Sequence, residues 1–165
     1  PHLAFRRQAK RVVSTQLWQT AQHIQQNIRH SRPPATLGLG LILRYMEWDV
    51  ALYRAAREHG LKPLQAGELI ETINWRVFGP PIEVGFKLSR LRSANNIVRA
   101  RWLTDLMFKL MFTKPFARAV HPSNSQVAFN VIACPLADYF KSQGVPELTR
   151  HAACSLDQYH SAAKL

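Results

Sequence analysis

The chain has 165 residues, of which 47% are hydrophobic, and this length and apolar content are typical of one globular domain with a sizeable core. Its 22 Lys and Arg residues outnumber its 10 Asp and Glu residues, which gives a formal net charge of +12. No apolar run is long enough to span a bilayer, and two cysteines are too few for a disulfide framework. We therefore expect a cytoplasmic protein with reduced cysteines and no transmembrane segment.

Basic residues concentrate in two segments, residues 6–32 and residues 87–118, whereas the C-terminal part is close to neutral. A clustered basic surface can attract nucleic acid, anionic lipid or a small anionic substrate. The sequence has no zinc-finger spacing, no RNA-binding aromatic strand and no glycine clamp. A small anionic substrate is therefore the partner we expect, and nucleic acid ranks below it.

Ala4 to Arg29 has apolar residues at helix-like intervals and predicts one helix. This helix either packs on the core or lies on a membrane surface as a basic amphipathic helix. The prolines within Ser31 to Thr36 indicate a linker after it. The chain is thus expected to divide into a basic helical N-terminal arm, residues 1–33, and a main body, residues 34–165.

Two further helices are predicted from Leu41 to His59, with Gly60 as the stop, and from Pro63 to Phe78, ended by Gly79-Pro80-Pro81. The short turn between them predicts antiparallel neighbours. Aromatic residues at helical spacing line either the core or a ligand pocket. Those on these two helices are Tyr45, Trp48, Tyr53 and Trp75.

Leu88 to Met111 predicts a single long helix that ends before Pro115. Its inward-facing residues are expected to be Leu91, Val98, Trp102, Leu106 and Leu110. Arg99 or Arg101 either binds a substrate carboxylate with its planar guanidinium or belongs to a solvated helix face. Ala117 to His121 and the alternating stretch from Gln126 to Cys134 predict an antiparallel hairpin.

The hairpin leads into Cys134-Pro135, and proline suits the first helical position because its missing N–H has no partner there. Cys134 is then the N-cap of a helix that stops at Gly144. A thiol at a helix N-terminus faces unpaired N–H groups and the positive end of the helix dipole. Both favour the thiolate, the form that attacks electrophiles. Cys134 is therefore a candidate nucleophile or, on the alternative interpretation, a small buried apolar residue.

A second helix is expected to start at Pro146, with Leu148, Ala152, Leu156 and Tyr159 as its apolar stripe. Glu147, His151, Cys154 and Asp157 fall three or four residues apart on a neighbouring face. This face is either a pocket wall with a thiol and a carboxylate or a solvated surface beside a buried cysteine. The histidines and cysteines match no standard zinc spacing, and the chain lacks HExxH and GxSxG motifs, so we expect no metal and no cofactor.

The pattern that runs from Cys134-Pro135 through Tyr139-Phe140, Gly144 and Pro146-Glu147-Leu148 to Cys154 and Asp157 resembles the L-2-amino-thiazoline-4-carboxylic acid hydrolase family. The resemblance implies that residues 34–165 form a hydrolase-like α+β domain that opens a small cyclic amidine ring. It further implies thiolate attack by Cys134 or Cys154. Asp157 would position water or move protons, with Glu147 in support. Expected substrate contacts are Asn130, Tyr139, His151 and Arg99.

Together these observations predict an α+β protein, mostly helical, in a single domain with a small antiparallel sheet. The function that the resemblance implies is hydrolysis of a non-peptide C–N bond, the ring opening of 2-amino-thiazoline-4-carboxylate to a carbamoyl-cysteine. Two alternatives stay open: a non-catalytic domain that binds a small ligand, and a basic nucleic-acid-associated protein. A homo-oligomer is compatible with each of them.

Overall fold

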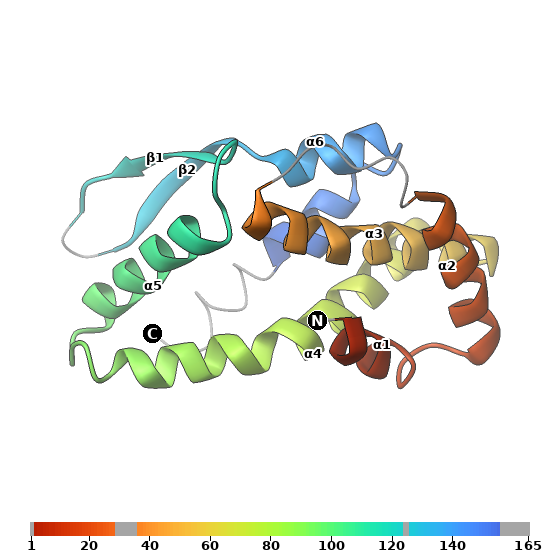
Figure 1. Ribbon diagram of the computed structural model, residues 1–165, viewed down its shortest axis with the longest axis horizontal. Helices are drawn as coiled ribbons and strands as arrows, with labels where there is room; N and C mark the ends of the chain where they lie inside the picture. The colour runs from red at the N-terminus through yellow and green to blue at the C-terminus, as the bar shows by residue number, and fades with distance from the viewer. Residues whose placement is uncertain (1, 29–35, 124–125, 156–165) are drawn as a thin grey trace.

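The structure, a computed structural model, describes residues 2–28, 36–123 and 126–155. It confirms a mostly helical α+β fold with one small antiparallel sheet (Figure 1). In chain order the elements are α1 (His2–Ala9), α2 (Thr15–Ile28), α3 (Leu37–Glu58), α4 (Pro63–Ser89), α5 (Asn96–Leu110), β1 (Ala117–His121), β2 (Ala128–Ala133), α6 (Pro135–Ser142) and the π-helix η2 (Thr149–Cys154).

The core lies where α3 meets α1, α2, the first half of α4, α6 and η2. Trp18 of α2 stacks on Trp48 of α3 with ring centroids 5.0 Å apart, and Phe5 of α1 packs against both Tyr45 and Trp48. Residues of α1 and α2, from the expected N-terminal arm, thus belong to the same core as the main body. The predicted linker, Ser31 to Thr36, lies outside the described residues except for Thr36.

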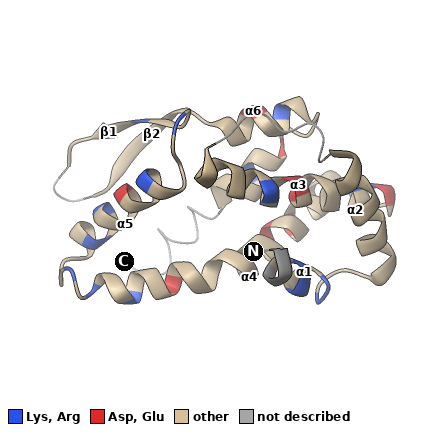
Figure 2. Ribbon diagram, in the orientation of Figure 1, with Lys and Arg blue, Asp and Glu red and all other residues tan. Residues whose placement is uncertain are grey.

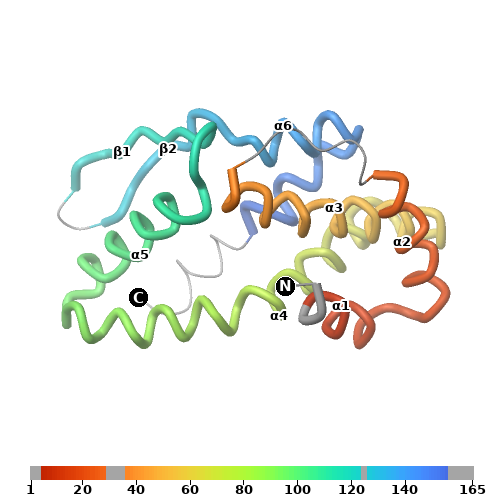
Figure 3. The backbone as a smooth tube through the Cα atoms, in the orientation of Figure 1, coloured from red at the N-terminus to blue at the C-terminus, as the bar shows by residue number. Residues whose placement is uncertain are grey.

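The second half of α4, helix α5 and the hairpin form a lobe beside this core (Figure 3). The hairpin has the predicted strands, with Val120 opposite Phe129 and Ala119 opposite Asn130. It packs on α5 through Phe108, whose ring meets Phe129 at a centroid distance of 5.5 Å and lies 4.3 Å below the Arg118 guanidinium. Because α5 has no buried residue, this lobe adds little to the core.

Several predicted boundaries were wrong. The stretch from Ala4 to Arg29 is two helices, because Ser14 accepts a hydrogen bond from the Leu17 N–H (3.3 Å) and so caps a new helix. The helix predicted to end at Phe78 continues to Ser89 through Pro80 and Pro81. Both prolines are exposed, so water can satisfy the carbonyls that lose their helical N–H partners.

The single helix predicted from Leu88 to Met111 was also wrong. The chain turns after Ser89, and Asn95 caps α5 by accepting from the N–H groups of Ile97 (2.8 Å) and Val98 (3.2 Å). The residues expected to face inward do not form a core, since Leu91 is 89% exposed and Leu110 is 59% exposed. These apolar residues remain largely exposed, because no other described element packs over them.

The structure confirms the junction between the hairpin and α6. Cys134 is the N-cap with extended backbone, Pro135 is the first helical residue, and Gly144 has a positive φ of 69°. The segment after Pro146 is instead a turn followed by the π-helix η2, which corrects the predicted α-helix. Within the described residues, no helix has the length and apolar character that crossing a membrane requires.

Candidate active site

The π-helix η2 changes which side chains share a face. Its bonds join residues five apart, as in the Ser155 N–H that donates to the Arg150 carbonyl, so a turn contains more residues than in an α-helix. The three-residue spacing of His151 and Cys154 therefore no longer places both on one face. Residues four apart are closer to alignment, and the Ser155 hydroxyl donates to the His151 carbonyl (2.5 Å). Short π-helical turns frequently occur at functional sites.

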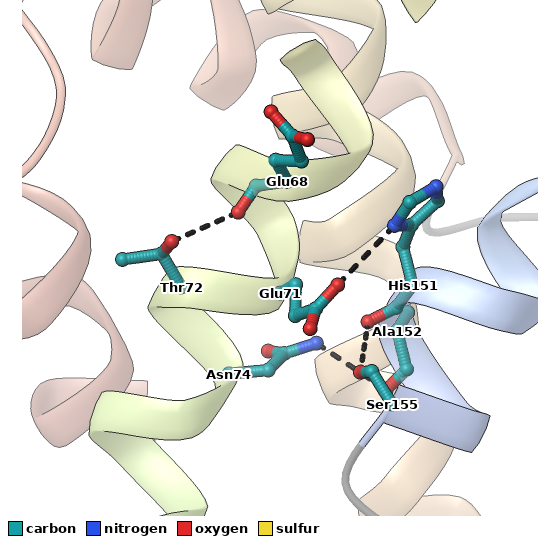
Figure 4. A network of polar contacts seen from close by, with 7 residues as sticks. All are labelled: Glu68, Glu71, Thr72, Asn74, His151, Ala152 and Ser155. Carbon is teal, nitrogen blue, oxygen red and sulfur yellow. Dashed lines mark hydrogen bonds and ion pairs between the residues drawn. The ribbon is translucent and has the colours of Figure 1, made fainter. Parts of the chain in front are cut away.

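The His151 side chain packs on α4 at the face that contains Gly67 and Glu71. Its Nδ1 is 3.4 Å from Oε2 of Glu71, and the two side chains are 15% and 26% exposed (Figure 4). The imidazole covers Gly67 so closely that a Cβ there would lie 2.5 Å from His151 Cδ2. Among the described residues, nothing hydrogen-bonds to the other ring nitrogen, Nε2. The carboxylate thus orients the ring, whose Cδ2–Nε2 edge faces Gly67.

A buried polar pair lies directly beneath the backbone of η2. Asn74 of α4 donates from Nδ2 to Oδ2 of Asp49 (3.0 Å) and to the carbonyl of Ala152 (3.4 Å). Asp49 is completely buried on α3, and this burial raises its pKa to about 8, against the smaller opposing effect of the Asn74 hydrogen bond. At neutral pH the carboxyl group is therefore largely protonated.

Both partners of this pair retain a buried oxygen that no described residue satisfies, Oδ1 of Asp49 and Oδ1 of Asn74. Buried polar atoms without partners are uncommon in folded proteins and often occur where function imposes them. Here they lie beside the one π-helix of the described chain. This combination of a perturbed carboxyl group and an irregular helix marks the region as a candidate site.

Helix α3 holds the turn that precedes η2. The Tyr53 hydroxyl donates to Oε1 of Glu147 (2.7 Å), and Arg54 donates from Nη2 to the Gln143 carbonyl (2.6 Å). Burial raises the pKa of Tyr53 to about 12, and the hydrogen bond and negative charge of Glu147 act in the same direction. Segment 143–155 is thus fixed to α3 and α4 by contacts at Gln143, Glu147, His151 and Ala152.

The structure gathers three of the predicted site residues on this segment. Glu147 and Cys154 are exposed, and His151 lies partly buried between them in the chain. The fourth predicted residue of this face, Asp157, lies outside the described residues. The two cysteines are not joined in a disulfide.

The remaining predicted residues lie elsewhere. Cys134 is half-buried at the start of α6, and its side chain makes no capping hydrogen bond. Tyr139 is 4% exposed within the core, next to Phe140. Asn130 is exposed on β2, opposite Ala119.

Arg99 serves the corner between α4 and α5. Its guanidinium donates to Ser89 Oγ (3.0 Å), to Asn96 Oδ1 (2.8 Å) and to the Phe86 carbonyl (2.9 Å). These contacts satisfy the C-terminal end of α4, which is a common role for arginine. Three of the five N–H donors of this guanidinium are therefore already bonded within the protein.

Sequence reasoning missed four residues of α3 and α4 that build the site, namely Asp49, Gly67, Glu71 and Asn74. A signal was present for two of them. Asp49 follows Trp48 and precedes Val50, and Asn74 follows Ile73 and precedes Trp75, so each is a polar residue inside an apolar run. No spacing rule connects Glu71 with His151, which is 80 residues away. Among the described residues, no group of three or more His, Cys, Asp and Glu residues is placed to hold a metal ion.

Comparisons of the chain with models of known protein families, with curated proteins and with solved structures gave no match.

Proposed function

We propose that this protein is a thiol hydrolase that opens a C–N bond in a small cyclic amidine, with 2-amino-thiazoline-4-carboxylate as the model substrate and a carbamoyl-cysteine as the product. The observation that carries the proposal is the contact of His151 on η2 with Glu71 on α4, because the exposed thiol of Cys154 lies on the same π-helix as His151. The resemblance of the block from Cys134 to Asp157 to the thiazoline hydrolase family supports it.

In the proposed reaction the Cys154 thiolate attacks the amidine carbon. Because the π-helix turns His151 and Cys154 to different faces of η2, His151 delivers a proton through one water molecule to the ring nitrogen as its bond to that carbon breaks. The opened chain then stays attached to the Cys154 sulfur through the former amidine carbon, as an imidodithiocarbonate, and the ring nitrogen has become an amine, with no atom lost. Water adds to this carbon and displaces the Cys154 thiolate, which releases the carbamoyl product. Glu71 keeps the imidazole oriented through both steps, as the third member of a catalytic triad does.

Asp49 and Asn74 act as positioning residues in this proposal. Both are buried, Asn74 donates to the η2 backbone at Ala152 and to Asp49, and the pair thus holds the π-helical turn rather than contacts the substrate. The net charge of +12 favours a substrate with a carboxylate. A thiolate nucleophile also requires a reducing compartment, and we therefore propose a cytoplasmic location.

The proposal is tested by incubating the protein with racemic 2-amino-thiazoline-4-carboxylate and detecting the ring-opened product by mass spectrometry. The wild type should form product, Cys154→Ser should form none, and Cys134→Ser should keep most of the activity. Alkylation of thiols should abolish turnover, whereas a chelator should leave it unchanged. A folded wild type that produces nothing, or a Cys154→Ser variant as active as wild type, would contradict the proposal.

A second cysteine variant keeps the test interpretable. Cys134 is the N-cap of α6, and its thiol makes no capping bond, so its replacement by serine adds a hydroxyl that caps at least as well. If only Cys134→Ser is inactive while its fold is intact, the nucleophile is Cys134 and the role given to η2 is wrong.

A further inference from the structure

The corner between α4 and α5, which we define as residues 84–99, carries an exposed apolar stripe. Val84 and Leu88 are 53% and 58% exposed and lie four residues apart on one face of α4. Leu91, in the turn two residues after α4 ends, is 89% exposed. An isolated exposed leucine needs no explanation, but three large apolar side chains exposed within eight residues form a defined surface.

Cations flank this stripe. Lys87, Arg90 and Arg92 are exposed, and none of them forms an ion pair with the described residues. The sequence from 84 to 104 contains no Asp or Glu. The corner is therefore both apolar and basic, with no acidic group of its own segment to neutralise it.

The corner is also rigid and prominent. Arg99 ties it together by donating to Ser89 Oγ and to the Phe86 carbonyl, and Asn95 caps the helix that follows. It lies at one end of the longest axis of the molecule (Figure 1), and Figure 2 shows basic residues at this end. The side chains of the stripe are thus held outward on a fixed projection.

We infer that this corner docks on an anionic lipid surface, with Leu88 and Leu91 entering the headgroup region and the flanking cations binding lipid phosphates. A helix end with leucines beside arginines and lysines has the composition of interfacial membrane-binding segments. Guanidinium groups bind phosphate oxygens in pairs. A projecting corner suits insertion into a deformable surface, whereas an amphipathic peptide partner is bound in a groove.

The full chain is tested by co-sedimentation with vesicles of phosphatidylcholine alone and with vesicles that contain phosphatidylserine. We expect binding only to the anionic vesicles and weaker binding as salt rises. Arg90→Gln with Arg92→Gln should weaken the partition coefficient about 25-fold, since each cation near an anionic membrane contributes about fivefold. Leu88→Ser with Leu91→Ser should weaken it by about tenfold or more, because less apolar surface enters the interface.

The matched control is Arg6→Gln with Arg7→Gln, which removes two exposed arginines of α1 and changes the net charge by the same amount. It should alter binding by about twofold or less, because these charges lie outside the corner. Equal loss in the control and the corner variants would overturn the inference, as would unchanged binding of the leucine variant. Binding to RNA or to an acidic polypeptide without binding to anionic vesicles would also overturn it.

Discussion

Replacing Gly67 by alanine should destabilise the wild-type protein but stabilise the His151→Ala variant. A Cβ at position 67 would lie 2.5 Å from His151 Cδ2 and 2.7 Å from Nε2, and both distances are too short for non-bonded atoms. The imidazole must therefore move, and Glu71 loses its partner. The three atoms nearest to this Cβ all belong to the imidazole, so removing the imidazole relieves the clash.

The two effects have opposite signs and comparable sizes. Alanine in a helix interior is about 1 kcal/mol more favourable than glycine. Overpacking a tight contact costs about 1–3 kcal/mol. Gly67→Ala should thus change the free energy of unfolding by about 0 to −2 kcal/mol in the wild type and by about +1 kcal/mol in His151→Ala, a coupling of about 1–3 kcal/mol.

Urea unfolding of the four proteins of this double-mutant cycle measures the coupling. Gly85→Ala is the control, because a Cβ there meets its nearest atom, Leu103 Cδ2, at an ordinary 3.8 Å, and it should stabilise the same helix in both backgrounds. Additive effects of Gly67→Ala and His151→Ala would refute the packing of the imidazole on α4. Gly67→Ala should also lower the rate of ring opening.

Tyr53→Phe removes the hydrogen bond to Glu147 and should lower the free energy of unfolding by about 0.5–1.5 kcal/mol in urea titrations; no change would mean that α3 does not hold this turn. Folding raises the pKa of Asp49 from its ordinary 3.8 to about 8. The stabilising contribution of the protonated carboxyl group is therefore complete below the pKa of the unfolded state and is lost as the pH rises through the pKa of the folded state. Between these values, stability should fall by up to about 1.4 kcal/mol per pH unit relative to Asp49→Asn, and parallel pH profiles of the two proteins would contradict the burial. Arg99→Met should speed amide hydrogen exchange at residues 90–93 while leaving the core unaffected, and unchanged exchange there would show that the corner does not depend on this guanidinium.

The parts of the fold that follow from local chemistry were predictable from the sequence. Pro135 after an alternating strand located the cap at Cys134, and Gly144 marked the end of α6 because few other residues adopt its positive φ. The two strands of the hairpin follow from alternation and the turn residues between them, whereas the irregular pairing at Ala117 and Arg118 has no sequence signal. Each of these features depends on a few neighbouring residues.

The remaining features depend on tertiary contacts that a sequence does not show. Proline signals a helix end, yet α4 continues through Pro80 and Pro81. The π-helical turn of η2 has no compositional signature, so the α-helical spacing of His151 and Cys154 predicted a shared face that η2 does not provide. The contact of His151 with Glu71 joins two helices that are distant in the chain.

The most direct test of the central claim is to locate the covalent intermediate. The protein is mixed with excess 2-amino-thiazoline-4-carboxylate, quenched in acid within the first turnover, and mapped by peptide mass spectrometry. We expect an adduct with the mass of the intact substrate on Cys154, absent in Cys154→Ser and formed more slowly in His151→Gln. Turnover with the adduct on Cys134, or with neither cysteine modified, would contradict it.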